Sequence, residues 1–428
     1  MGRDNLPFTM SPIRSTVARE RRSDQQTMAI NQPGAVGDIN SQVLSAGRIT
    51  SIDLMRGIVM IVMVIDHVHH FYSWAAYDPT DLGNATPAQF LTRWITHFCA
   101  PAFMFLAGTS AWLHARNSGS TRGQLQRFLL GRGLVLVFLE LTWVSFSWRF
   151  DFHGLVLQAI WALGWSMVLL SGMLYLPTRA VAALALLLVF GHDLLDHLRF
   201  EDFATNGQVW GWLWAVVHQY YVGTLSSGYS IVLVYPLVPW VGVMALGYCF
   251  GELLQQAPQL RHRAMAALGL ACIGLFVVLR LNNLYGEPQL WQANPRGVLY
   301  TALAVLNVTK YPPSLLYLLM TLGPVLLLLP LLESWHGVWA QRIMVFGRVP
   351  LFFYLVHLPL LHFSSRIAGK VFGGVHPQIG WSLPTGYDLS LLRVYLMWAM
   401  TIVITYPLCR WYMDYKSSHR DRWWLSYL

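Results

Sequence analysis

The stretch RITSIDLMRGIVMIVMVIDHVHHFYSW occupies residues 48–74. It is almost wholly apolar up to Ile65. It then places Asp66 and His67, followed by two more histidines, where a membrane helix would still lie in the bilayer. An ionisable side chain inside a spanning helix costs roughly 2.5–3.5 kcal/mol on insertion scales, so its presence indicates a functional site. We therefore expect a membrane-spanning helix over residues 52–73 that carries such a site.

Arg56 and His67 are the two residues that this pattern singles out. They are about three turns apart at 3.6 residues per turn, so they share a helix face with a rise of about 16 Å between them. A neutral imidazole can take a proton from an attacking hydroxyl or amine, which makes His67 a candidate general base. Asp66 is the candidate that orients it or balances its charge, although adjacent helix residues point about 100° apart and Asp66 can instead serve another neighbour. The alternative is a histidine that only hydrogen-bonds across the bundle.

The composition indicates a membrane protein. The chain has 428 residues, of which 55% are hydrophobic and 11% are charged, whereas about 25% of the residues in soluble domains are charged. The net charge of +9 comes from basic residues at helix ends and in short loops, which is an orientation signal and not a nucleic-acid-binding patch. The four cysteines lie far apart in apolar runs and show no metal or redox spacing.

Apolar runs predict an all-α polytopic membrane protein, a bundle of about ten transmembrane helices (nine to eleven). The predicted spans are 52–73, 90–114, 126–147, 154–176, 180–197, 229–252, 264–282, 313–332, 346–364 and 390–409. The aromatic segment 208–222 is too short for a clear span, so we expect it at the membrane interface or as a re-entrant piece. If it spans, the number of helices is eleven.

The division of the chain follows from these spans. Residues 1–47 are polar and predict a disordered tail, residues 48–412 form one transmembrane domain, and residues 413–428 form a C-terminal tail. With the N-terminus in the cytoplasm, 20 of the 29 Lys and Arg residues fall on the cytoplasmic side. The positive-inside rule therefore predicts that both termini are cytoplasmic.

Further polar residues inside the predicted spans are candidates for donor or substrate binding. Arg93 and His97 lie four residues apart on one helix face, Glu140 lies in the middle of a span, and His70 follows His67 by one turn. A buried carboxylate must be paired, protonated or facing water. We therefore assign Arg56, Arg93, His97, Glu140 and His70 to donor or substrate binding, each with packing or ion pairing as the alternative.

Metal binding is a rival chemistry for the histidines. His67 and His70 share a helix face, and His97 or His192 would have to complete a zinc site. The sequence has no HExxH motif or cysteine pairing, so we expect no metal. The span 346–364 holds His357 and His362 between aromatic residues, a pattern that favours packing over a place in the cavity. The long connection before residue 313 predicts a structured lid or an interfacial anchor.

Five stretches resemble the heparan-α-glucosaminide N-acetyltransferase-like family of bacterial membrane proteins. They are SIDLMRGIVMIVMVIDHV, RWITHFCAPAFMFLAG, YPLVPWVGVMALGY, KYPPSLLYLLMTLGP and FGRVPLFFYLVHLPLLH. The Arg56-to-His67 spacing is similar to that of the wider class of integral-membrane acyltransferases. The resemblance implies an acyltransferase of the bacterial inner membrane. Its donor would be acetyl-CoA or another acyl-CoA, and its acceptor a sugar, a glycoconjugate or another compound.

This chain differs from the enzyme that names the family at one position. The lysosomal enzyme that names the family has Asn at the position of His67 and its active His about a helix length further on, near Tyr77 and Asp78 here. Either His67 has taken the catalytic role or this branch does something else.

Two other classes of function stay open. The first is a proton-coupled transporter or flippase of a lipid or glycoconjugate, with Asp66, His67 and Glu140 as a proton relay. The second is a non-catalytic membrane partner of another enzyme, which the cost of several intramembrane ionisable groups disfavours. Membrane lipids are expected partners, and the chain can form a homo-oligomer.

Overall fold

The structure is a computed structural model. It describes residues 49–72, 78–205, 207–225, 227–371, 391–419 and 421–427. Residues 51–428 make up one compact unit. The predicted N-terminal tail, residues 1–47, lies outside the described residues.

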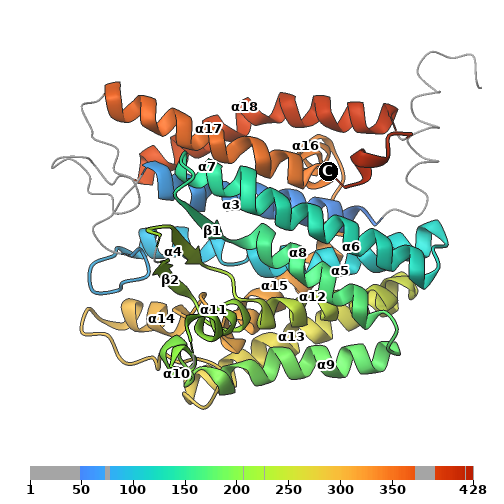
Figure 1. Cartoon of the computed structure of the whole chain (residues 1–428). Coiled ribbons are helices and arrows are strands. Elements are labelled where there is room, and N and C mark those ends of the chain that lie inside the picture. The colour runs from blue at the N-terminus through green and yellow to red at the C-terminus, as the bar shows by residue number, and fades with distance from the viewer. Residues whose placement is uncertain are drawn as a thin grey trace, which may run out of the picture. The chain divides into compact units, whose positions relative to one another are not determined.

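The described part of the chain is helical apart from three short strands (Figure 1). The α-helices in its first half are α3 (Thr50–Tyr72), α4 (Pro87–Thr96), α5 (Cys99–Ser118), α6 (Arg122–Leu139), α7 (Ser145–Arg149), α8 (Ala159–Met173), α9 (Thr178–Gly191), α10 (Phe200–Ala204) and α11 (Gln208–Val217). Those in its second half are α12 (Leu237–Phe250), α13 (Pro258–Leu281), α14 (Val298–Leu306), α15 (Leu315–Glu333), α16 (Val338–Arg348), α17 (Pro350–Val371) and α18 (Leu391–Ser418). A π-helical turn, η1 (Glu140–Val144), joins α6 to α7, and the 3₁₀ turns are η2 (His192–Leu195), η3 (Gly251–Gln255) and η4 (Trp423–Ser426).

The prediction of an all-α polytopic membrane protein is confirmed. Among the described residues, eight helical segments are long and apolar enough to cross a membrane, and each overlaps one predicted span. The predicted span 52–73 corresponds to α3, which has 23 residues but contains three charged side chains. The predicted span 154–176 contains α8, which has only 15 residues. The predicted number of about ten spans is therefore not confirmed.

Two predicted spans begin with strands instead of helix. Residues 154–157 form β1 (Gly154–Leu157) and residues 230–233 form β3 (Ser230–Leu233), which pair in parallel. The third strand, β2 (Tyr221–Thr224), pairs antiparallel with β3, giving the order β1-β3-β2. A short, mainly apolar run does not distinguish a buried strand from a helix by periodicity, which explains the incorrect prediction.

The predicted interfacial segment 208–222 is mainly α11, whose ten residues rise only about 15 Å and cannot cross a bilayer. The sheet, α4, α11 and α14 gather at the end of the bundle where α3 ends, on the left of Figure 1. The last predicted span, 390–409, is part of α18, which continues to Ser418 into the predicted C-terminal tail.

The predicted span 90–114 is divided into α4 and α5 by a break at His97 and Phe98. Pro101 does not kink a continuous helix there. It lies in the first turn of α5, where a missing backbone N–H leaves no helical hydrogen bond unmade.

Glycines allow α3 to pack closely against a neighbouring helix, α16. A Cβ atom on Gly57 would overlap the carbonyl oxygen of Ile343, and one on Gly347 would overlap the carbonyl oxygen of Asp53. The backbones of α3 and α16 are therefore in direct contact. Gly108 also lies at a close crossing, since a Cβ atom there would overlap the backbone of Met244 in α12. Small residues at helix crossings are the usual means of association in membranes.

We expect Gly347→Ala to lower the thermal stability of the detergent-purified protein, since forced overpacking costs about 1–3 kcal/mol. Gly274→Ala is the matched control, because a Cβ atom at this position in α13 meets nothing within 4 Å. The control should unfold at the wild-type temperature or slightly above it. Equal behaviour of the two variants would contradict the close contact between α3 and α16.

Candidate functional site

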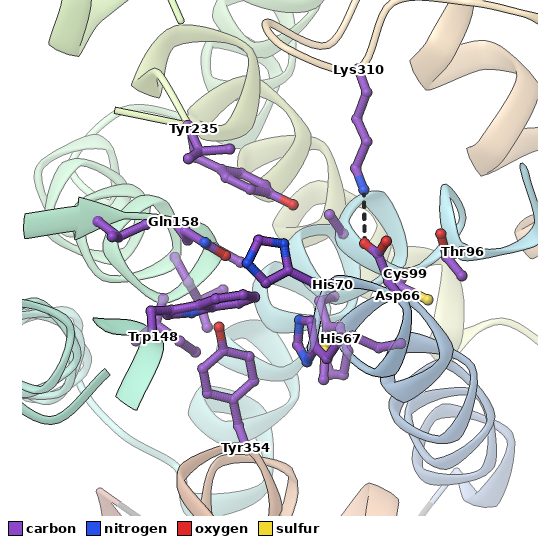
Figure 2. A pocket seen from close by; sticks show the side chains of 18 of the residues that line it. Asp66, His67, His70, Thr96, Cys99, Trp148, Gln158, Tyr235, Lys310 and Tyr354 are labelled. Atoms are coloured by element: carbon purple, nitrogen blue, oxygen red, sulfur yellow. Dashed lines mark hydrogen bonds and ion pairs between the residues drawn. The ribbon is translucent and has the colours of Figure 1, made fainter. Parts of the chain in front are cut away.

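A cavity of about 670 Å³ lies among α3, α5, the α6–α8 region, β3, α17 and the segment that precedes α15 (Figure 2). The side chains that α3 contributes to the cavity wall change from apolar to ionisable along the helix. Met60 and Met63 come first, and Asp66, His67 and His70 follow in the next two turns. The cavity therefore has an apolar part and a part rich in ionisable groups, with His67 at the boundary.

His67 is hydrogen-bonded to a second histidine. The two rings approach with 2.8 Å between His67 Nδ1 and His357 Nε2, and they are inclined by only 14°. His67 is 7% exposed and His357 is completely buried. Trp148 and Tyr354 present ring edges to His67 at centroid distances of 5.3 and 5.9 Å. The surrounding aromatic side chains pack against the imidazole of His67 and hold it in place.

The hydrogen bonds determine which nitrogen of His67 carries the proton. His357 Nδ1 lies 2.8 Å from the carbonyl oxygen of Phe353, which can only accept, so Nδ1 of His357 is the donor. In a neutral imidazole the other nitrogen is then an acceptor. His357 Nε2 accordingly accepts from His67 Nδ1, and Nε2 of His67 keeps its lone pair. The pair of rings prepares His67 to act as a base through Nε2.

Asp66 contacts two cations. Arg93 of α4 donates to Oδ1 of Asp66, and Nζ of Lys310 lies 3.5 Å from its Oδ2. We expected Asp66 either to orient His67 or to serve another neighbour. Its side-chain contacts follow the second alternative, and the ring of His67 is oriented by His357.

Lys310 enters the cavity from a short segment that is anchored on both sides. Glu287 accepts hydrogen bonds from the backbone N–H of Thr309 at 2.9 Å and from the hydroxyl of Ser314 at 2.8 Å. Nε2 of His192 lies 2.8 Å from the carbonyl oxygen of Pro313. Burial lowers the pKa of the Lys310 ammonium, and the charge of Arg93 lowers it further.

Arg56 does not line this cavity. It contacts the carbonyl oxygen of Leu106 at 2.9 Å and the hydroxyl of Ser110, and it lies 3.7 Å from Asp53 on its own helix. A second arginine, Arg132, does line the cavity.

His97 and Glu140 also lie outside the cavity wall, while His70 and Arg93 belong to it. The carbonyl of His97 accepts from the hydroxyl of Tyr317 at 2.7 Å. Glu140 is fully buried at the start of the π-helical turn η1, and its Oε1 accepts from the backbone N–H of Gln158 at 2.7 Å. Since Gln158 is a wall residue, Glu140 holds part of the cavity wall in place from outside the cavity. Single π-helical turns are often found at functional sites.

Sequence reasoning missed Lys310 as a site residue and favoured packing for His357. One signal for Lys310 was present: it is the sole Asp, Glu, Lys or Arg between Arg296 and Glu333. His357 gave no comparable signal, because its partner is 290 positions away. In the described part of the chain, no three His, Cys, Asp or Glu side chains are grouped so that they could hold a metal ion.

A cavity among membrane-spanning helices, with a hydrogen-bonded histidine in its wall, is an arrangement that an integral-membrane transferase can use. A family model for heparan-alpha-glucosaminide N-acetyltransferase, catalytic, matches residues 48–280, more than half of the chain. The protein belongs to this family, as the sequence resemblance predicted, and it is a multi-pass membrane protein of the acyltransferase type. No curated protein matches the chain significantly. Of the two positions that the resemblance indicated, Asp78 lines the cavity and Tyr77 lies outside the described residues.

We expect Glu140→Leu to lower the stability of the protein by about 1–3 kcal/mol, because it leaves the buried N–H of Gln158 without an acceptor. Glu140→Gln keeps an acceptor oxygen of the same shape and should retain most of the stability. Thermal unfolding of the two purified variants measures the difference. Equal losses in both would show that the charge of Glu140, and not this hydrogen bond, is required.

Proposed function

We propose that the protein transfers an acetyl or similar acyl group from a cytoplasmic acyl-CoA to the amine or hydroxyl of a sugar or other acceptor. We place it in the bacterial inner membrane with both termini in the cytoplasm, as the distribution of basic residues favours. The observation that carries the proposal is the hydrogen bond between His67, which lines the cavity, and the buried His357.

His67 is the general base in this proposal. The acceptor nitrogen or oxygen attacks the thioester carbonyl, and Nε2 of His67 takes the proton that it loses. The new C–N or C–O bond forms as the C–S bond breaks. The imidazolium then returns the proton to the departing CoA sulfur. His357 accepts from Nδ1 throughout, so it keeps the ring in place in both protonation states of His67.

Arg56 and Arg132 are proposed to meet the donor. By the predicted topology Arg56 lies toward the cytoplasmic end of α3, about 16 Å along the helix axis from His67. CoA is a polyanion, and it is attracted to a basic cytoplasmic face. Met60 and Met63 line the cavity between the levels of Arg56 and His67 on α3, and an uncharged thioester arm fits such a surface. A cavity enclosed by the bundle also excludes the water that would hydrolyse the thioester.

We expect His67→Ala to reduce acyl transfer by about 10²–10⁴-fold, the usual contribution of a general base. The assay follows transfer of radiolabelled acetyl from acetyl-CoA to glucosamine by the detergent-purified protein. His362→Asn is the matched control. His362 is another fully buried histidine of α17, and the Asn amide can still donate to the carbonyl oxygen of Ser147 that Nδ1 of His362 contacts. Full activity of a folded His67→Ala variant would overturn the proposed role.

Donor binding can be separated from chemistry by a thermal-shift titration with acetyl-CoA and free CoA. A ligand that binds only the native state raises its stability by mass action. We expect the wild type and His67→Ala to be stabilised, and Arg56→Ala to lose most of the shift. The absence of a shift at millimolar ligand in the wild type would contradict the acyl-CoA donor and favour the transporter alternative.

A further inference from the structure

The wall of the cavity carries an excess of positive charge. Among the described residues that line it are four Lys or Arg side chains and two Asp side chains. Arg149 forms an ion pair of its own with Asp151, 2.9 Å away. Beside His67, however, Arg93 and Lys310 both contact the single carboxylate of Asp66, and Figure 2 shows the contact with Lys310. Uncompensated charge in such a place is costly unless a further anion neutralises it.

Lys310 is the cation with a donor to spare. An ammonium group has three N–H donors. Asp66 accepts one of them at 3.5 Å, the long limit of a hydrogen bond, and the side chain of Tyr311 takes a second. The Lys310 side chain is only 8% exposed, and its segment is anchored through Glu287 and His192. The chain therefore orders a lysine in the cavity wall and leaves one of its three donors for a ligand.

The position of this group relates it to the reaction. Asp66 and His67 are consecutive residues, so their Cα atoms are about 3.8 Å apart. A ligand that replaces part of the contact between Asp66 and Lys310 has its other end within reach of His67. Asp78, the second carboxylate of the wall, accepts hydrogen bonds from the backbone N–H and the hydroxyl of Thr80, both at 2.8 Å.

We propose that Lys310 and Arg93 form a subsite for an anionic group of the acceptor, a carboxylate or a phosphate, beside the nucleophile that His67 deprotonates. This inference rests on the proposed function and names its substrate class: acceptors that carry an amine or hydroxyl and a nearby negative charge. Asp66 holds the two cations in place while the site is empty, and it shares them with the incoming anion.

The test uses three amino-sugar probes that differ in charge: glucosamine, glucosamine 6-phosphate, and glucosamine bearing a lactyl carboxylate on O3. Dissociation constants are measured by thermal shift without donor, and KM values by acetyl transfer. In the wild type we expect at least one anionic probe to bind about tenfold or more tightly than glucosamine, as charge-assisted hydrogen bonds are the strong ones. The probe that binds tightly distinguishes phosphate from carboxylate.

Three variants test the assignment of the subsite. Lys310→Gln should abolish the preference for the anionic probe, and Lys310→Arg should retain it. Arg263→Gln removes one exposed positive charge from α13 and should leave the preference unchanged. Asp66→Asn should tighten binding of the anionic probe, because the two cations lose their competing carboxylate. A purely structural ion cluster would give no such gain.

The outcomes separate the subsite from the proposed function. Equal binding of the charged and uncharged probes by the wild type, or a preference that survives Lys310→Gln, overturns the subsite even if acetyl transfer occurs. Anion binding that depends on Lys310, with no transfer to any probe by the wild type, supports the subsite and counts against acyl transfer. His67→Ala should keep the binding preference while losing transfer.

Discussion

The hydrogen bond between His67 and His357 is the contact on which the site depends. It joins the first described helix to α17 across 290 positions of sequence, and a shift of about 1 Å in either helix would lengthen or break it. The backbone contact between Gly57 and Gly347 prevents that shift, because α16 immediately precedes α17 and cannot slide along α3. The contact between these two glycines thus favours the alignment of the helices that the histidine pair requires.

Charge is distributed along the cavity in an order that suits acyl transfer. The proposed donor end has Arg132 in the wall and Arg56 outside it, the middle has Met60, Met63 and His67, and the far end has Asp66 with Arg93 and Lys310. A cation at each end would attract an anionic substrate from each side. The neutral middle leaves the base uncharged and able to accept a proton. Low polarity around the base also strengthens each hydrogen bond that fixes it.

The sequence predicted the helices well and the site only in part. Apolar length identifies spanning segments because the bilayer imposes it, and intramembrane charge indicates α3 as the candidate functional helix. Intramembrane charge did not reveal that Asp66 meets Arg93 and Lys310, or that His67 meets His357. Helix periodicity shows which face a residue occupies but not which helix packs against that face. Arg56 and His67 share a face of α3, yet only His67 reaches the cavity. The strands β1 and β3 were missed because a short, mainly apolar run fits either structure.

The residues of the candidate site come partly from the region that the family model matches and partly from the region after it. The family match ends at residue 280, whereas Lys310, Tyr354 and His357 come from the part of the chain beyond it. The matched region holds the proposed base His67 and one cation of the proposed subsite, Arg93. The histidine that contacts His67 and the second cation, Lys310, both lie beyond it. A match to the family model is therefore silent on half of the contacts that define this cavity.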